Sequence, residues 1–328
     1  MLSPKAVYET QVKKTADIMP AGPTAYARAV ELLRQGNLVA LPTETVYGLA
    51  ALASNDAAVR AIYDTKGRPR HNPLIVHIFN AKKANDLGEV SPLAQTLMNR
   101  FWPGSLTLVL PKKPSAKISA FASADLDTIA IRCPVGSWVD AFCKMGFQGP
   151  IVMPSANLSG HISPTTAQHV LDDLGDRIEL IIDAGPCSGG VESTVLSIDG
   201  NRATLLRPGV IPVEAFVPFV SDLRLPDKKA KPIAPGMLES HYAPRAKLRL
   251  NATKRRQDEV FLGFGATDIK ADMNLSETAN LEEAARKLYA CLRTLDALDK
   301  AVIAVAPIPM RGVGQAINDR LKRAAAPK

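Results

Sequence analysis

The sequence predicts a mixed α/β protein made of two unequal domains. Its 328 residues exceed what one average domain needs. Short apolar strands alternate with amphipathic helices, yet several strands follow each other without a helix between them, which favours a mixed sheet over a regular doubly wound one. A proline-rich stretch without periodicity interrupts this pattern at residues 225–245. We therefore predict a larger domain over residues 1–224, a linker over 225–245 and a small α/β domain over 246–328.

The elements of the larger domain are predicted from apolar spacing and from residues that begin or end helices. Residues 1–22 have no such pattern and are predicted to be irregular. Ser91 and Ser137 are predicted helix caps, and Asp199-Gly200-Asn201 predicts the turn of a hairpin. The predicted helices span residues 24–35, 56–66, 92–101, 137–145 and 167–174. The predicted strands span residues 38–41, 74–79, 105–110, 128–132, 150–153, 178–182, 193–198 and 203–206.

The small domain alternates strand and helix, which predicts a Rossmann-like half-unit. Its predicted strands span residues 247–250, 259–264 and 301–307, and its predicted helices span 281–295 and 314–324. The segment Gly263-Phe264-Gly265 is too short for a dinucleotide-binding G-x-G-x-x-G pattern. We therefore predict a structural or regulatory role for this domain.

Composition narrows the class of ligand and the compartment. The net charge of +8 and a pI near 9.3 favour an anionic ligand, either a nucleotide or a nucleic acid. Only 5% of residues are aromatic, which argues against a base-stacking surface for single strands. The four cysteines are widely spaced, so we expect neither structural zinc nor a disulfide framework. We therefore expect a reducing, cytoplasmic compartment. We expect no membrane span and no signal peptide, because Lys13, Lys14 and Asp17 interrupt the apolar N-terminal stretch.

A basic cluster lies between the predicted helix 56–66 and the predicted strand 74–79. It contains Lys66, Arg68, Arg70 and His71. A loop held between two packed elements can face a ligand, and Arg and Lys together suit a polyanion such as a triphosphate. The alternative is a solvated basic loop, which is how most charge runs are used.

Further polar residues lie where other apolar strands begin or end. Side chains at strand ends of one sheet converge readily on one cavity. Local explanations stay open for several: Arg132 as an edge ion-pair partner, His77 as a core histidine, Ser155 and Asn157 as turn caps, and Arg207 as a strand exit. The group comprises Thr43, Glu44, Thr45, His77, Arg132, Ser155, Asn157, Glu192, Ser193, Thr194 and Arg207.

Eight sequence blocks, taken in order, resemble the two-domain form of the threonylcarbamoyl-AMP synthase family. This family has a YrdC-like domain. No single block is specific, but eight in order are, and they cover nearly the whole chain. They are Pro42-Thr43-Glu44-Thr45-Val46-Tyr47-Gly48-Leu49, Lys66-x-Arg68 with Ser155-x-Asn157, Asn72-Pro73-Leu74-Ile75-Val76-His77, Trp102-Pro103-Gly104, Glu192-Ser193-Thr194, Leu206-Arg207-Pro208-Gly209, Pro235-Gly236-Met237 with His241-Tyr242-Ala243-Pro244, and residues 312–320.

The resemblance implies a fold and a reaction. The fold would be a twisted mixed sheet with flanking helices around an open basic cavity, followed by the Rossmann-like domain. The reaction would join L-threonine, bicarbonate or carbon dioxide, and ATP into threonylcarbamoyl-AMP with release of pyrophosphate. A separate transferase would then place the group on a tRNA adenosine. Mg²⁺ is expected to accompany the ATP, and no metal site made by the protein itself is expected.

The resemblance also implies roles for single residues. Lys66, Arg68, Ser155 and Asn157 would form the catalytic set. The ATP-binding residues would be Lys66, Arg68, Thr128, Asn157, Thr165, Arg207 and Tyr242, with Tyr242 closing over the nucleotide. The threonine-binding residues would be Thr43, His77, Arg132, Ser155 and Ser193.

Two other functions fit parts of the sequence. A basic cavity would also suit double-stranded RNA or tRNA, bound by shape and phosphates without turnover. A carbamoyl-transfer domain like those of hydrogenase maturation proteins is disfavoured, because the chain lacks zinc-finger cysteine pairs and an acylphosphatase-like segment. Leu238-Glu239-Ser240 departs from the family pattern, where a basic residue is expected in the linker. Direct tRNA contact and the oligomeric state stay open.

Overall fold

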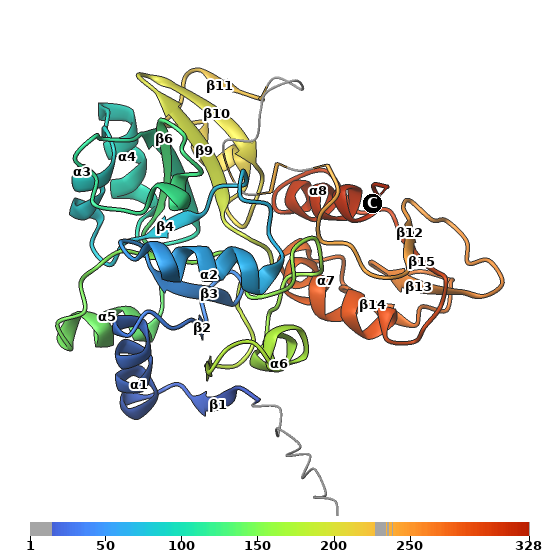
Figure 1. Ribbon diagram of the computed structural model, residues 1–328. Helices are drawn as coiled ribbons and strands as arrows, with labels where there is room; N and C mark the ends of the chain where they lie inside the picture. The colour runs from blue at the N-terminus through green and yellow to red at the C-terminus, as the bar shows by residue number, and fades with distance from the viewer. Residues whose placement is uncertain (1–14, 227–233, 235, 238, 328) are drawn as a thin grey trace, which may run out of the picture.

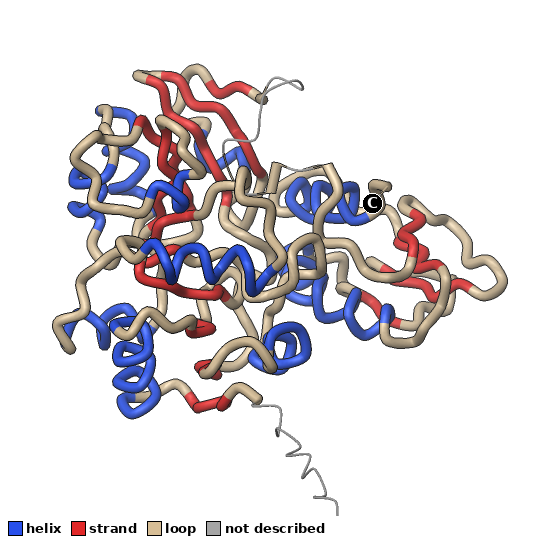
Figure 2. The backbone as a smooth tube through the Cα atoms, viewed as in Figure 1, coloured by secondary structure: helices blue, strands red, loops and turns tan. Residues whose placement is uncertain are grey.

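The computed structural model describes residues 15–226, 234, 236–237 and 239–327. Most of the predicted irregular N-terminus, the lysine run of the linker, and linker residues Pro235 and Leu238 therefore lie outside the described residues. Within the described residues the chain forms two sheets, seen as separate red groups in Figure 2. The first sheet ends at Arg224 and the second begins at Lys247.

The larger sheet is mixed, as predicted. Its strands β1–β8–β2, β4–β6, β5–β9 and β10–β11 pair in parallel, and the other neighbours pair antiparallel. In sheet order the strands are β1 (Asp17–Pro20), β8 (Leu180–Asp183), β2 (Val39–Leu41), β3 (Gly48–Leu52), β7 (Ile151–Val152), β4 (Ile75–His77), β6 (Thr128–Arg132), β5 (Leu106–Pro111), β9 (Thr194–Asp199), β10 (Arg202–Arg207) and β11 (Leu223–Arg224).

Helices cover this sheet on both faces (Figure 1). α2 (Asp56–Lys66), α4 (Pro92–Phe101) and α6 (Ala167–Leu174) share one apolar core, and α1 (Pro23–Arg34) and α5 (Ser137–Lys144) share the core of the opposite face. The short helices are η1 (Ala81–Lys83), α3 (Ala84–Leu87), η2 (Ala120–Ser123) and η3 (Val213–Phe216).

Beside α1 and α5, part of the second face is covered by the linker instead of a helix. Ile75, Val109, Ala130, Val195 and Leu206 form a small core there with Ala234 and Met237 of the linker. This arrangement leaves the neighbouring strand ends accessible to a ligand.

The helix beside the predicted basic cluster has both of its ends fixed by the local sequence. Asn55 begins α2, and its side chain accepts hydrogen bonds from the N–H groups of Ala57 and Ala58. Gly67 ends α2 with a left-handed φ of 59°, which glycine adopts without strain. The observed bounds equal the predicted ones, and Lys66 and Arg68 consequently flank a sharp turn.

Three local predictions were wrong. Residues Asp17–Pro20, predicted to be irregular, form edge strand β1, whose exposed side chains lack an alternating pattern. Strand β3 was not predicted, because its Gly48-Leu49-Ala50-Ala51-Leu52 sequence has low β propensity and is buried on both faces. Ser137 does not cap α5; Gly136 does, and the Ser137 hydroxyl lies 2.5 Å from the Tyr26 hydroxyl. The predicted cap at Ser91 is confirmed.

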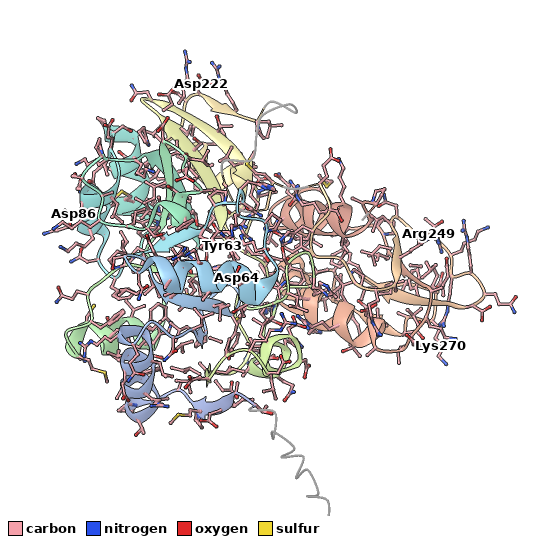
Figure 3. The ribbon with its side chains drawn as sticks, in the orientation of Figure 1. Tyr63, Asp64, Asp86, Asp222, Arg249 and Lys270 are labelled. Atoms are coloured by element: carbon pink, nitrogen blue, oxygen red, sulfur yellow. The ribbon has the colours of Figure 1, made fainter. Side chains whose placement is uncertain are left out.

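The second sheet is entirely parallel, in agreement with the predicted Rossmann-like unit. Its order is β12 (Lys247–Arg249), β15 (Val302–Val305), β13 (Glu259–Gly263) and β14 (Met273–Asn274). Helices α7 (Leu281–Asp296) and α8 (Gly314–Ala324) lie on the side that faces the larger domain (Figure 1). Arg249 and Lys270 lie at the opposite, outer end of this domain (Figure 3).

The two domains share an apolar core. Val46, Ile162 and Val191 of the larger domain pack with Leu288 and Ile317 of α7 and α8, among other residues. The two domains thus form one packed body. No helix among the described residues is long and apolar enough to cross a membrane.

The close approach of the domains predicts a large effect for Gly190→Ala. Gly190 has a φ of 74°, and an added Cβ would overlap the backbone of Ala285 and Arg286 in α7. Gly185 is the matched control, since its φ is 77° and an added Cβ would meet no atom within 4 Å. We expect Gly185→Ala to cost about 1 kcal/mol. Gly190→Ala should lower the thermal unfolding midpoint at least twice as much; equal losses would contradict the tight contact.

Candidate functional site

A small polar cavity lies where four strands of the large sheet meet the linker. Its volume is about 50 Å³. It is lined by Thr45, Val46, Arg68, Ile75, His77, Arg132, Met153, Pro154, Ser155, Glu192, Ser193, Arg207, Gly236, His241 and Tyr242. The cavity thus brings together seven of the residues predicted for a site, from β4, β6, β10 and several loops.

Strand alternation explains why these side chains share one face. In a β-strand, residues two apart point to the same side. Ile75 and Ala130 belong to the small core under the linker, so His77 and Arg132, two residues further, point to the same side as that core. His77 and Arg132 are also register partners in the parallel pair β4–β6. The sheet therefore holds the imidazole and the guanidinium side by side.

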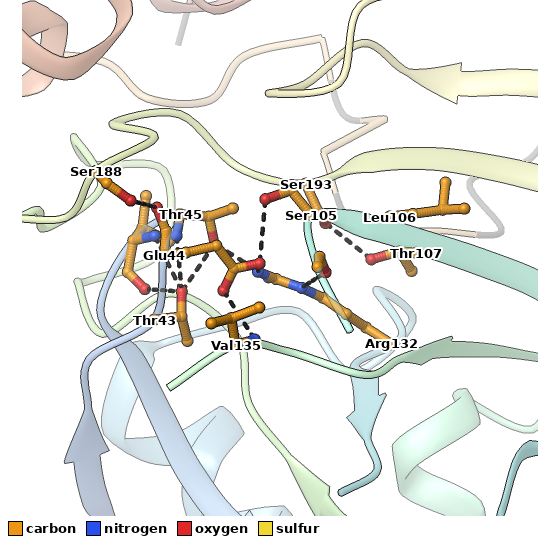
Figure 4. Close-up of polar contacts among 12 residues, drawn as sticks. Thr43, Glu44, Thr45, Ser105, Leu106, Thr107, Arg132, Val135, Ser188 and Ser193 are labelled. Atoms are coloured by element: carbon orange, nitrogen blue, oxygen red, sulfur yellow. Dashed lines mark hydrogen bonds and ion pairs between the residues drawn. The ribbon is translucent and has the colours of Figure 1, made fainter. Parts of the chain in front are cut away.

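Arg132 is held in place by a fork of contacts (Figure 4). Its Nη2 donates to Oε1 of Glu44 at 2.5 Å, its Nη1 donates to the hydroxyl of Thr45 at 3.0 Å, and its Nε donates to the carbonyl of Gly104. Glu44 also accepts from the Ser105 hydroxyl and the Val135 N–H. A guanidinium has five N–H donors, and these three contacts leave two for a ligand within the described part of the chain.

His77 is buried and is held as a neutral imidazole. Burial first, and then the positive charge of Arg132, place the pKa of His77 well below its usual value. Its Nδ1 lies 3.2 Å from the carbonyl of Ile75, which requires a proton on Nδ1. Nε2 is then a hydrogen-bond acceptor beside the Arg132 donors.

Lys66 and Arg68 have different surroundings. The amine of Lys66 donates to the carbonyls of Ser155 at 2.6 Å and of Asn157. Burial and then the charge of Arg68 lower the pKa of Lys66 well below its usual value. Arg68 lines the cavity and donates to the carbonyls of Asn72 and Pro73. Lys66 thus fixes the turn that carries Ser155 and Asn157, and Arg68 presents its charge to the cavity.

Arg207 forms the wall opposite these residues. Its Nε and Nη2 donate to the carbonyl of Ser193, and Nη2 also contacts the Ser193 hydroxyl at 3.1 Å. Gly236 packs against Arg207 and Tyr242 so closely that an added Cβ would lie 2.6 Å from Cδ of Arg207. Two of its neighbours in the cavity wall thus come from the linker.

Five predicted site residues do not line the cavity. Lys66 and Asn157 lie behind its wall, where the Lys66 amine donates to the carbonyl of Asn157. The other three are Thr43, Thr128 and Thr165. The Thr43 hydroxyl is used inside its own turn, where it accepts from the N–H groups of Thr45 and Val46. Thr128 lies at the opposite end of β6 from Arg132. The Thr165 hydroxyl lies 3.4 Å from Nδ1 of His169, just before α6. Their assignments to ligands stay predictions.

The structure adds three lining residues to which the sequence assigned no role. Thr45 takes the place beside Arg132 that was expected of Thr43, because the turn faces Thr43 inward. Glu192 belonged to the predicted group of polar residues at strand ends, without a role of its own. His241 of the linker is buried, and burial followed by the charge of Arg68 lowers its pKa to about 3. Only the motif block of the linker pointed toward His241.

Several buried polar atoms near the cavity have no partner among the described residues. These are Oδ1 and Nδ2 of Asn72, Oδ1 of Asn157 and Nδ1 of His241. Buried polar atoms are normally hydrogen-bonded, and unpaired ones cost free energy. Their grouping beside Arg68 and Ser155 is typical of a site that receives a polar ligand.

Comparison with known proteins agrees with this arrangement. The Sua5/YciO/YrdC family model, described as telomere recombination, matches residues 31–209. The model of the threonylcarbamoyl-AMP synthase C-terminal domain matches residues 209–326. The threonylcarbamoyl-AMP synthase of Bacillus subtilis is 44% identical over 91% of this chain and 92% of its own. That of Pyrococcus abyssi is 38% identical over 90% and 93%.

A solved structure extends the comparison to the fold of both domains. The crystal structure of P. abyssi Sua5 complexed with L-threonine superimposes with a TM-score of 0.87 at 35% identity. It covers 94% of this chain and 98% of that chain. Both domains, their order and the residues between them are shared, so the chain belongs to the threonylcarbamoyl-AMP synthase family in its two-domain form.

Proposed function

We propose that this chain makes L-threonylcarbamoyl-AMP from L-threonine, bicarbonate and ATP, with release of pyrophosphate. The observation that carries the proposal is one cavity with two differently built halves. Arg132, His77 and Ser193 offer donors and an acceptor that suit an amino acid. Arg68 and Arg207 offer positive charge that suits phosphates. Relatives that match over nine-tenths of the chain carry the name of this activity.

In the threonine half, the two remaining donors of Arg132 would bind the carboxylate. Glu44 neutralises part of the charge and fixes the direction of the guanidinium. Nε2 of His77 would accept a hydrogen bond from the amine or the side-chain hydroxyl of threonine. Thr45 and Ser193 lie beside Arg132 and Arg207, and their hydroxyls would complete the contacts.

In the nucleotide half, Arg68 and Arg207 would bind the triphosphate. Both are buried, and burial lowers the pKa of Arg68 to about 10 and also lowers that of Arg207. Binding phosphates would therefore compensate two desolvated cations. Mg²⁺ would enter as part of the ATP complex, where phosphate oxygens supply ligands that it prefers. Lys66 would act indirectly, by holding the turn of Ser155 and Asn157.

The reaction then requires little covalent participation by the protein. The threonine amine adds to carbon dioxide and loses a proton, which gives a carbamate. A carbamate oxygen attacks the α-phosphorus of ATP, and pyrophosphate leaves with the electrons of the broken P–O bond. Positioning and charge neutralisation supply most of the acceleration in such a step. The cavity is smaller than the ~300 Å³ at which ligand pockets usually begin, so part of its wall would move outward to admit ATP.

The product is a mixed anhydride that water destroys, so a group-transfer enzyme acting on tRNA would have to consume it promptly. The net charge of +8 is compatible with direct contact to tRNA. The four free cysteines support a reducing compartment such as the cytoplasm.

The activity is tested by product mass. The purified chain is incubated with ATP, Mg²⁺, bicarbonate and each amino acid in turn, and pyrophosphate and adenylate are followed. We expect threonylcarbamoyl-AMP with threonine and no adenylate when bicarbonate is removed. An adenylate formed with another amino acid would keep the proposed reaction but change the identity of its amino-acid substrate. Tight tRNA binding without any adenylate would instead favour the RNA-binding alternative.

Arg132→Ala should separate the two halves of the site. We expect the KM for threonine to rise at least tenfold and the KM for ATP to change less than threefold, because Arg132 would contact only threonine. Arg249→Ala is the control: Arg249 makes an equally short ion pair, with Glu259, at the outer end of the small domain (Figure 3). Equal rises in both KM values for Arg132→Ala would contradict its assignment.

Lys66→Met should affect stability and activity together. Two buried carbonyls would lose their donor, which costs about 1–3 kcal/mol. We expect a lower unfolding midpoint, and a fall in kcat, since Ser155 and Asn157 would no longer be fixed. Lys83→Met removes an exposed lysine of the same domain and should change neither. A loss of ATP affinity with unchanged stability would instead point to direct phosphate binding by Lys66.

A further inference from the structure

Two buried side chains of the small domain, Tyr289 and Arg320, bind a residue that lines the cavity. Glu192 lines the cavity, and its Oε2 accepts from Nε of Arg320 at 2.7 Å and from the Tyr289 hydroxyl at 3.0 Å. Its Oε1 accepts from the Ser163 hydroxyl at 2.6 Å. Tyr289 belongs to α7 and Arg320 to α8, so the partners of this carboxylate come from both domains.

Arg320 reaches three parts of the wall at once. Its side chain is fully buried, with 0% exposure. Nη2 donates to the carbonyl of Pro208 at 2.9 Å, directly after Arg207 in the chain. The guanidinium carbon lies 5.1 Å from the centre of the Tyr242 ring, a cation–π distance. Asp319 fixes the third side of the group through Nη1 at 2.6 Å.

Further contacts of α7 and α8 hold the same stretch of linker. The N–H of His241 donates to the carbonyl of Arg323 in α8. The ring of Tyr242 stacks on that of Tyr289, with centroids 5.9 Å apart. Tyr242 therefore contacts both Tyr289 and Arg320, and its hydroxyl end reaches Gly236 beside Arg207.

The positive charge of Arg320 also stabilises the ionised form of Glu192. Burial alone would raise the pKa of Glu192, but the charges of Arg320 and Arg207 outweigh it and lower that pKa to about 2. Without Arg320, the Glu192 carboxylate would keep Arg207 as its main cation. It would then compete with any anion that Arg207 binds.

We propose that Arg320 is a positioning residue for the nucleotide half of the cavity. It holds the Tyr242 ring, fixes the backbone after Arg207, and neutralises the Glu192 carboxylate beside Arg207. The proposal rests on the proposed assignment of Arg207 and Tyr242 to ATP. It gives the small domain an indirect part in substrate binding, where the sequence predicted a structural or regulatory role.

A second arginine at the domain interface, Arg293, is half-buried and provides the control. Arg293 of α7 also joins the domains: it pairs with Asp173 of α6 at 2.6 Å and donates to the carbonyl of Ile162. It contacts neither the linker tyrosine nor Glu192. Arg293→Met therefore loosens the same interface away from the nucleotide half.

The test compares Arg320→Met, Arg320→Lys and Arg293→Met by KM for ATP, KM for threonine and unfolding midpoint. For Arg320→Met we expect the KM for ATP to rise at least tenfold and the KM for threonine to change less than twofold. Arg320→Lys keeps the charge but loses the planar fork, and should lie between Arg320→Met and the unsubstituted chain. Arg293→Met should lower the midpoint and leave both KM values unchanged. If Arg320→Met does not fold, Arg320→Lys against Arg293→Met decides the question.

Two results would overturn the proposal. One is an equal rise in both KM values for the Arg320 variants, which would indicate that the substitutions loosen the whole site. The other is an unchanged KM for ATP in variants of Arg320. Arg207→Gln separates this failure from failure of the proposed site: if it raises the KM for ATP while the Arg320 variants do not, only the role of Arg320 is wrong. If Arg207→Gln also leaves that KM unchanged, the ATP assignment itself is wrong.

Discussion

The carboxylate of Glu192 is charged although it is buried, and four groups from two domains stabilise it. Ser163, Tyr289, Arg320 and the nearby Arg207 stabilise the charge that burial disfavours. Removing the small domain would take away Tyr289 and Arg320, two of the four groups that stabilise this carboxylate. The same set of contacts therefore joins the two domains and shapes the cavity.

The other cations of the site are also held by hydrogen-bonding groups of the protein. Arg68 is bound by two backbone carbonyls, Arg132 by Glu44 and Thr45, and Arg207 by Ser193. Each guanidinium is thus fixed in direction before a ligand arrives. Preorganised charges in a site of low dielectric stabilise a transition state more than mobile ones do, because they need not reorient. The neutral state of His77 follows from this arrangement, since Arg132 and burial both oppose its protonation.

Much of the local structure could be predicted from the sequence. The helices Asp56–Lys66 and Gly314–Ala324 have the predicted bounds, since capping residues and apolar spacing act over a few residues. Strand β3 could not be predicted, because its Gly-Leu-Ala-Ala-Leu sequence becomes a strand only through pairing with β2 and β7. The cavity was partly predictable: polar residues after apolar strands mark the edge of the sheet. The contacts between those residues depend on register and on distant partners. Glu192 and Arg320 lie 128 residues apart, and nothing in a single sequence pairs them.

The most direct measurement is a crystal structure of the chain with L-threonine and a non-hydrolysable ATP analogue bound together. The account predicts the threonine carboxylate at Arg132 and Ser193, the triphosphate at Arg68 and Arg207, and the α-phosphorus facing the threonine amine. Tyr242 should contact the nucleotide while Arg320 keeps its bond to Glu192. A nucleotide bound in the parallel-sheet domain, or a threonine carboxylate away from Arg132, would contradict it.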